Sequence, residues 1–206
     1  MKYNRSQQEQ KPPRYDTFAA YYDRVMSPLE RWLFARLRSK IFASLPQDAN
    51  LLEVGAGTGA NFSFYPGTTQ ATASELSFKM IEKARNKETS KRVRIVQSCA
   101  EQLPFADDSF DAAVATLVFC SVNSPNEAFA ELRRVVRSGG TIAMLEHVRP
   151  DGLLGYVFDA LSVFTVALFD DHFNRRTAEA ARQAGLNVHT VSRHALGIVN
   201  VIVCRV

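Results

Sequence analysis

The chain has 206 residues, of which 46% are hydrophobic and 22% are charged, which is enough for one globular domain with a sizeable core. Its three cysteines, Cys99, Cys120 and Cys204, are widely spaced, which excludes a disulfide framework and favours a reducing compartment. The first residues lack the apolar stretch of a signal peptide, so we expect a cytoplasmic protein.

The net charge of +4 comes from the N-terminal segment. Residues 1–48 hold nine Lys and Arg against five Asp and Glu, whereas residues 49–206 hold sixteen of each. A basic segment suits an anionic membrane surface or nucleic acid, although a solvated basic face has the same composition. The sequence has no nucleic-acid-binding signature and no zinc-ligand spacing, so we expect no nucleic-acid partner and no metal.

The first 45 residues predict a tail and two helices. Residues 1–14 are polar and are expected to be disordered. Residues 16–26 predict one helix, and a capping box at Ser27 and Glu30 predicts the start of a second, which runs to about residue 45. Basic and aromatic residues alternate on this second helix, which suits core packing or a lipid interface. Its predicted apolar arc comprises Leu29, Trp32, Leu33, Leu37 and Ile41, with Phe34 at the edge.

From residue 51 onward, apolar runs alternate with helical patterns. This alternation predicts an α/β protein with a doubly wound parallel sheet. An apolar stretch at 152–169, interrupted by Asp159, is interpreted as a helix that covers the active site rather than a membrane span. The predicted strands are 51–54, 70–74, 93–97, 110–118 and 141–148, followed by an antiparallel hairpin of 186–192 and 197–203. The predicted helices are 60–65, 77–87, 124–137 with a capping box at Ser124, and 175–184.

The stretch 51–61 carries the strongest functional signal. An apolar run ends in Glu53, and three glycines follow at alternate positions, Gly55, Gly57 and Gly59. The pattern predicts a buried strand, a tight turn and a helix start, where glycine lets a ligand approach the backbone closely. A phosphate would gain nothing from Glu53, whereas a ligand with an ammonium group would. The third glycine comes too soon for the G-x-G-x-x-G pattern of NAD-dependent oxidoreductases, which stay an alternative.

Two further polar positions follow predicted strands. Glu75 lies about twenty residues beyond the glycine turn, where a carboxylate can accept hydrogen bonds from both ribose hydroxyls. The segment 98–101 follows the third predicted strand. Because ligands of open α/β sheets bind beyond the carboxyl ends of the strands, we expect the glycine turn, Glu75 and 98–101 to meet in one site.

Together these motifs resemble the class I S-adenosylmethionine-dependent methyltransferases. Within that superfamily the chain is similar to the ubiquinone/menaquinone C-methyltransferases, the small membrane-associated thiol methyltransferases and the bacterial phospholipid N-methyltransferases. The resembling segments are 51–59 (motif I), Glu75 (the ribose acid), 101–111 (the entry to the fourth strand), 132–140 (the turn after the next helix) and, for the last two groups, 116–122, 146–148 and 168–170.

The resemblance implies a Rossmann-like, seven-stranded sheet that is mostly parallel, with an antiparallel C-terminal hairpin strand and an N-terminal helical extension. It implies one domain at 15–206, with a helical cap at 15–45 and an apolar lid at 152–172. It also implies S-adenosyl-L-methionine as cofactor and a small apolar or lipid-like acceptor: a phospholipid amine, a quinone or a thiol. The implied cofactor contacts are Tyr22, Glu53, Gly55, Ala56, Gly57, Thr58, Gly59, Asn61, Glu75, Leu76, Cys99, Ala100, Glu101, Thr116 and Leu117.

The sequence departs from the family pattern at Cys99, where many relatives carry an aspartate that contacts the adenine amino group. A thiol is a weak acceptor, so a backbone carbonyl or a neighbouring side chain would have to replace that contact.

For catalysis, His147 is the candidate general base, or else a structural histidine bonded to loop backbone. Asp171 and His172 are further catalytic candidates, in a polar cluster with Asp170 that could bind substrate or, as a weaker alternative, a metal. A non-catalytic binding module with the same fold is the other alternative. Weak, reversible binding of residues 1–45 to anionic lipid surfaces is expected, while the sequence leaves the acceptor atom and the oligomeric state open.

Overall fold

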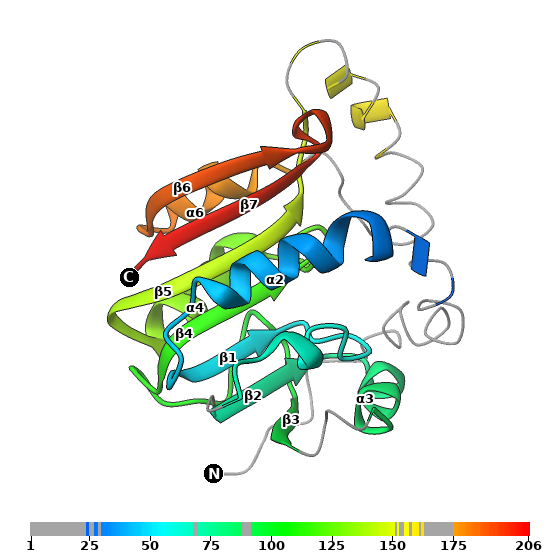
Figure 1. The fold of residues 1–206 in the computed structure, drawn as a ribbon. Helices are drawn as coiled ribbons and strands as arrows, with labels where there is room; N and C mark the ends of the chain where they lie inside the picture. The colour runs from blue at the N-terminus through cyan, green and yellow to red at the C-terminus, as the bar shows by residue number, and fades with distance from the viewer. Residues whose placement is uncertain are drawn as a thin grey trace, which may run out of the picture.

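The computed structural model describes residues 24, 27–28, 30–67, 70–87, 92–150, 152, 155–156, 158–160, 162 and 175–206 (Figure 1). Seven strands form one sheet in the order β3-β2-β1-β4-β5-β7-β6. The first five strands are mutually parallel, and β7 lies antiparallel between β5 and β6. The strands are β1 (Asn50–Val54), β2 (Gln70–Glu75), β3 (Val93–Gln97), β4 (Phe110–Thr116), β5 (Val136–His147), β6 (Asn187–His194) and β7 (Val199–Arg205).

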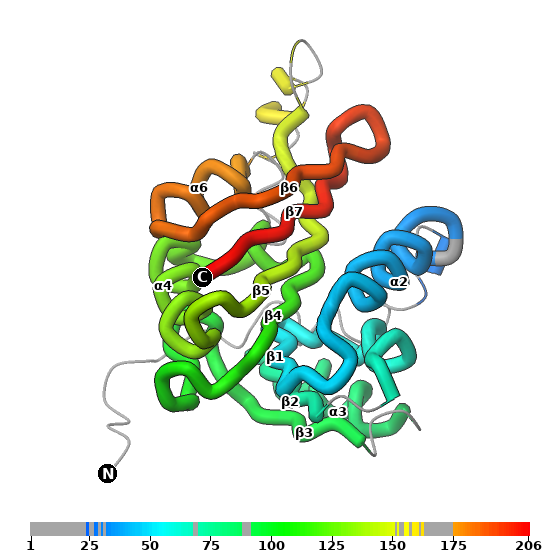
Figure 2. The backbone as a smooth tube through the Cα atoms, turned by 60° about the vertical axis from the view of Figure 1, so that its left-hand side comes forward, coloured from blue at the N-terminus to red at the C-terminus, as the bar shows by residue number. Residues whose placement is uncertain are grey.

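Helices cover both faces of the sheet, as Figures 1 and 2 show for α2 on one face and for α4 and α6 on the other. Alternate residues of each central strand serve the two faces, so Ala113 and Ala115 of β4 pack toward α4 and Ala112 and Val114 toward α2. The helical elements are the π-helix η2 (Glu30–Phe34), α2 (Ala35–Ala43), the 3-10 helix η3 (Phe62–Phe64), α3 (Phe78–Arg85), α4 (Pro125–Val135), α6 (Thr177–Gln183) and the 3-10 helix η5 (Ala195–Gly197).

The predicted architecture is confirmed: the sheet is doubly wound and seven-stranded, and it ends in an antiparallel hairpin. Three local predictions are wrong. The helix predicted at 60–65 is only the 3-10 turn η3. The helix from residue 124 ends at Val135, because β5 begins directly afterwards to continue pairing with β4. Ser124 occupies the N-cap position but makes no side-chain capping bond, whereas Ser77 accepts one from the Met80 N–H at 3.2 Å.

The second predicted helix also begins differently. Ser27 and Pro28 are already helical, so Ser27 is not the N-cap. Glu30 forms an ion pair with Arg38 at 2.8 Å. A π turn takes more residues than an α turn, so η2 changes how residues 30–34 are oriented relative to α2. Trp32, predicted to face the core, is therefore 88% exposed, and Phe34 is buried in its place.

Other predictions fall outside the described residues: the tail at 1–14, the helix at 16–26, Leu29, and most of the apolar stretch at 152–172. In the part of the chain that is described, no helix is long and apolar enough to cross a membrane.

Candidate functional site

The main cavity lies where the carboxyl ends of β1, β2 and β4 and the loop after β3 meet the N-terminal helix. Its volume is about 590 Å³, within the usual range for cofactor and substrate sites. The glycine turn contributes Gly55, Ala56, Gly57 and Thr58 to its lining. Six further predicted contacts line it: Glu75, Leu76, Ala100, Glu101, Thr116 and Leu117. The structure thus brings together most of the residues that were predicted from the sequence to contact the cofactor.

The glycine turn has the backbone that its sequence predicts. Gly55 and Gly57 have φ of +68° and +56°, a region that side chains disfavour. A Cβ on Gly55 would lie 2.4 Å from Cγ2 of Val118, so this glycine lets the turn pack against the loop after β4. A Cβ on Gly57 would meet nothing within 4 Å. Gly57 therefore presents bare backbone to the cavity, as close approach of a ligand requires.

Glu75 is held rigidly at the cavity wall. Its Oε2 accepts a hydrogen bond from the Gly57 N–H at 2.8 Å, and its Oε1 accepts one from the Ser77 N–H at 2.8 Å. Each carboxylate oxygen can accept more than one hydrogen bond. A fixed carboxylate beside a glycine turn suits a vicinal diol such as ribose.

Cys99 and Glu101 behave differently although they are neighbours. The Cys99 thiol donates to Oε2 of Glu101 at 2.6 Å, and burial together with this carboxylate raises the pKa of the thiol to about 11. Cys99 is therefore a neutral thiol at neutral pH. Oε1 of Glu101 accepts from the N–H groups of Asn123 and Ser124 at 2.8 and 3.2 Å. Glu101 lines the cavity, whereas Cys99 is not among its lining residues.

Glu53 lies behind the glycine turn and is only 1% exposed. It accepts hydrogen bonds from Asn61 Nδ2 at 2.5 Å and from the Tyr65 hydroxyl. Burial raises the pKa of Glu53, and burial together with the adjacent Glu53 raises the pKa of Tyr65 well above its usual value. Neither Glu53, Asn61 nor Gly59 lines the cavity, so their cofactor contacts stay predictions.

Arg38 is the site residue that the sequence analysis missed. It is 4% exposed yet lines the cavity, together with Glu30. Its Nε donates to Oε1 of Glu30 at 2.8 Å, and its Nη1 donates to Oγ1 of Thr116 at 2.7 Å and to Oδ1 of Asn61. Arg38 belongs to the basic residues that alternate with aromatic ones on this helix, and a charged side chain is ordinarily assigned to the surface. It is four residues after Phe34 and three before Ile41, a helical spacing that could have placed it on the buried face of α2.

The candidate catalytic residues lie away from this cavity or outside the described residues. The His147 ring packs edge-on against Phe34 with centroids 5.7 Å apart, and burial lowers its pKa to about 4. His147 is not among the lining residues of the cavity, and its role as a base stays a prediction. Tyr22, Asp171 and His172 are outside the described residues, among which no group of three potential metal ligands occurs.

Comparison with known proteins relates this geometry to a family. The methyltransferase domain family matches residues 52–144, which hold the glycine turn, Glu75 and Glu101. A human thiol S-methyltransferase is 37% identical over 131 residues, which make up 61% of this chain and 53% of that protein. A phosphatidylethanolamine N-methyltransferase of Cereibacter sphaeroides is 35% identical over 121 residues, 55% of this chain and 59% of that protein. The chain thus spans little more than half the length of these relatives.

The fold is shared more widely than the sequence. A solved SAM-dependent methyltransferase of Thermotoga maritima superimposes with a TM-score of 0.72 over 93% of this chain and 98% of that chain, at 22% identity. At that identity the likeness establishes the sheet topology and its helices.

Proposed function

We propose that this chain, a member of the class I S-adenosylmethionine-dependent methyltransferases, transfers a methyl group to a small apolar or lipid-like acceptor. One observation carries the proposal: a cavity at the point where the strand order reverses, between β1 and β4, is walled by a bare glycine turn and a fixed carboxylate. This is the place where open α/β sheets bind their ligands.

The residues present fit S-adenosylmethionine, which supplies a methyl group already activated on a sulfonium. Glu75 is placed to accept hydrogen bonds from the two ribose hydroxyls, and Gly57 leaves room for the ligand beside it. The transfer itself requires mainly that the site exclude water and align the acceptor with the methyl group. A general base is needed only for an acceptor that ionises poorly.

The acceptor class is supported by the apolar side of the cavity. Leu76, Leu117 and Val118 line it, and Phe78, at the start of α3 close by in sequence, is half exposed. The two relatives act on a thiol and on phosphatidylethanolamine, so the shared domain serves acceptors of different chemistry. This apolar side of the cavity suits a thiol, a quinone or a lipid amine, and we propose an acceptor of this kind.

A screen with radiolabelled methyl donor tests this function. Acceptors offered would be an alkyl thiol, phosphatidylethanolamine vesicles and a demethylated quinone, each with wild-type protein and with Glu75→Ala. Label in one acceptor that requires wild-type protein would support the proposal. Binding of S-adenosylhomocysteine without label in any acceptor would instead favour the non-catalytic binding module.

We also propose that the N-terminal helix rests on an anionic lipid surface. Trp32 is 88% exposed, and Arg36 and Lys40 are exposed on the following turns. An exposed indole with nearby cations suits the headgroup region, where each cation contributes on the order of 1 kcal/mol. Arg38 does not take part, because it is buried.

Vesicle co-sedimentation tests the membrane contact with point variants, since deleting residues 1–45 would remove the buried core residues Leu37 and Ile41. Trp32→Ala and Lys40→Glu should each reduce recovery on anionic vesicles. The matched control is Leu196→Ala on the β6–β7 hairpin, where the side chain is also largely exposed. Equal recovery on neutral and anionic vesicles, or equal loss in the control, would exclude this surface.

A further inference from the structure

We propose that Arg38 and Glu30 bind the methionine end of the cofactor, Arg38 its carboxylate and Glu30 its ammonium group. The inference rests on the proposed binding of S-adenosylmethionine and deepens it. It assigns a task to two residues that were not among the predicted contacts and that the structure brings to the cavity wall.

The first step is that the acid of the glycine motif is already engaged. Glu53, which the sequence matched to an ammonium group, accepts bonds from Asn61 on one oxygen and from Tyr65 on the other. It is buried and does not line the cavity. An amino-acid zwitterion in this cavity must therefore find its charged partners elsewhere, because burying unpaired charges costs several kcal/mol.

The second step is the distribution of charge around the cavity. Its charged lining residues in the described part of the chain are Glu30, Arg38, Glu75, Lys87 and Glu101. Glu75 and Glu101 follow β2 and β3, the side expected for ribose and adenine. Lys87 follows α3 and lies 3.5 Å from the Thr58 hydroxyl. Among these described residues, the N-terminal helix alone presents a cation and an anion side by side, as a zwitterion requires.

The third step is the geometry of that pair. The guanidinium of Arg38 is fixed from behind by Thr116 at 2.7 Å and by Asn61, and Glu30 accepts from its Nε at 2.8 Å and its Nη2 at 3.3 Å. Among the described residues these four bonds leave one Nη2 hydrogen for a ligand carboxylate, since a guanidinium has five N–H groups. A charged donor held in advance in this way binds a carboxylate strongly and in a set direction.

The arrangement has a consequence for catalysis. Arg38 lies on α2, and it bonds Asn61 from the glycine loop and Thr116 from the end of β4. A methionine moiety bound to Arg38 and Glu30 would be anchored at its far end, with its sulfonium held between this pair and the ribose at Glu75. Arg38 and Glu30 would thus align the methyl group with the acceptor.

Calorimetry with paired ligands tests the assignment. The ligands are S-adenosylhomocysteine, its decarboxylated analogue and its deaminated analogue. The proteins are wild type, Arg38→Lys, Arg38→Met, Glu30→Gln and the control Arg36→Met, which removes an exposed cation of the same helix that does not line the cavity. All are checked for folding by thermal unfolding. Wild type should bind each analogue about 10-fold or more weakly than the complete ligand, as for loss of one charged hydrogen bond. Arg38→Met should bind the complete and decarboxylated ligands alike, and Glu30→Gln the complete and deaminated ligands alike. Arg36→Met should keep both preferences.

The outcomes separate this inference from the proposed function. If wild type binds no S-adenosylhomocysteine, the proposed function itself fails. If wild type binds it and the preferences survive in Arg38→Lys, Arg38→Met and Glu30→Gln, or disappear in Arg36→Met instead, the assignment to Arg38 and Glu30 is wrong. Should Arg38→Met not fold, Arg38→Lys and Glu30→Gln still decide the matter.

Discussion

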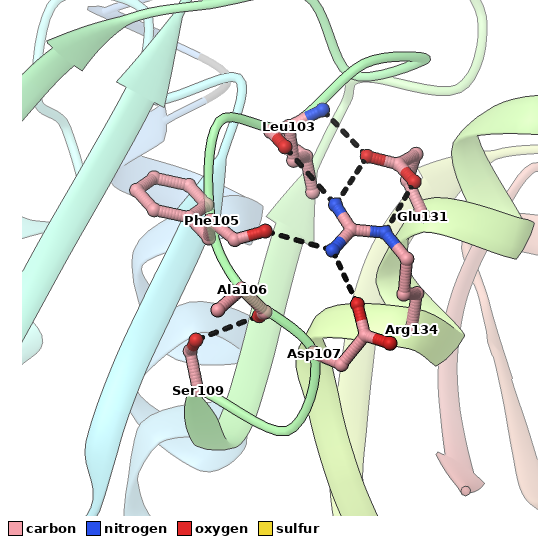
Figure 3. A network of polar contacts seen from close by, with 7 residues as sticks. All are labelled: Leu103, Phe105, Ala106, Asp107, Ser109, Glu131 and Arg134. Carbon is pink, nitrogen blue, oxygen red and sulfur yellow. Dashed lines mark hydrogen bonds and ion pairs between the residues drawn. The ribbon is translucent and has the colours of Figure 1, made fainter.

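Two arginines each form several hydrogen bonds to carboxylates and other polar groups: Arg38 at the cavity, and Arg134 next to the loop that leads into β4. Arg134 of α4 bonds Glu131 at 2.7 Å and Asp107 at 2.8 Å, and it also donates to the carbonyl oxygens of Leu103 and Phe105 (Figure 3). Arg38 likewise bonds an acid and two other polar side chains. Arg134 is partly exposed, whereas Arg38 is buried.

The two clusters contain carboxylates whose pKa values are shifted in opposite directions: Glu131 beside Arg134, and Glu53, which is linked to Arg38 through Asn61. The hydrogen bond from Arg134 is the main reason why the pKa of Glu131 lies below its usual value. Burial is the main reason why the pKa of Glu53 lies above its usual value, and the bonds from Tyr65 and Asn61 offset this only in part. The Arg134 cluster therefore joins a loop to a helix and stabilises the fold. In the cluster of Arg38, Asn61 and Glu53 at the cavity, burial instead disfavours the charged form of Glu53. Such an arrangement is typical of a ligand site.

Among the substitutions that test these assignments, the largest change in ligand affinity is expected at Glu75. Glu75→Ala removes the proposed ribose acceptor and the partner of the Gly57 N–H. We expect S-adenosylhomocysteine affinity to fall about 100-fold, as for two hydrogen bonds to a charged group. Calorimetry would measure it, with the exposed Glu127→Ala on α4 as control. A folded Glu75→Ala protein with wild-type affinity would remove the ribose assignment.

The next largest expected effect is a loss of stability on substitution of Arg134. Arg134→Ala leaves Glu131 and two loop carbonyls without their donor, so we expect the free energy of unfolding to fall by about 2 kcal/mol. Urea denaturation would measure the change, and the exposed neighbour Arg133→Ala should alter stability by less than about 0.5 kcal/mol. Cofactor affinity of the folded variant should equal that of wild type. A weakened affinity would contradict the division between the two clusters.

The smallest expected effect is a difference in how the free energy of unfolding depends on pH at Glu131 and at Glu53. Glu131 has a folded pKa below its unfolded value, so its stabilising contribution is present at neutral pH and is lost as the pH falls through the folded pKa. Glu53 has a folded pKa above its unfolded value, so its contribution is present below the unfolded pKa and is lost as the pH rises through the folded pKa.

Denaturation from pH 7 down to pH 4 would measure both contributions against wild type. The stability difference between wild type and Glu131→Gln should shrink on acidification, while wild type should gain stability relative to Glu53→Gln. If the stability difference from wild type changed with pH in the same way for Glu131→Gln and Glu53→Gln, the proposed difference between the surroundings of Glu131 and Glu53 would be wrong.

The sheet was predictable because its signals are local. Alternating apolar runs and helical patterns are enough to give a doubly wound sheet, and the spacing of the glycines is enough to give the turn after β1. The cavity cluster was not predictable in the same way. Arg38 lies on the buried face of α2, but a charged residue there is expected only once its partners Asn61 and Thr116 are known. Glu53 bonds Asn61 and Tyr65, and these contacts between distant residues arise only in the folded chain.

The most direct test of the account is a calorimetric titration of the wild-type chain with S-adenosylhomocysteine, run beside one with NAD. Gly55, Gly57 and Glu75 surround a cavity that suits an adenosyl ligand with no phosphate. The account predicts saturable binding of S-adenosylhomocysteine at a single site and no heat of binding with NAD. A folded sample that binds NAD and leaves S-adenosylhomocysteine unbound would contradict it.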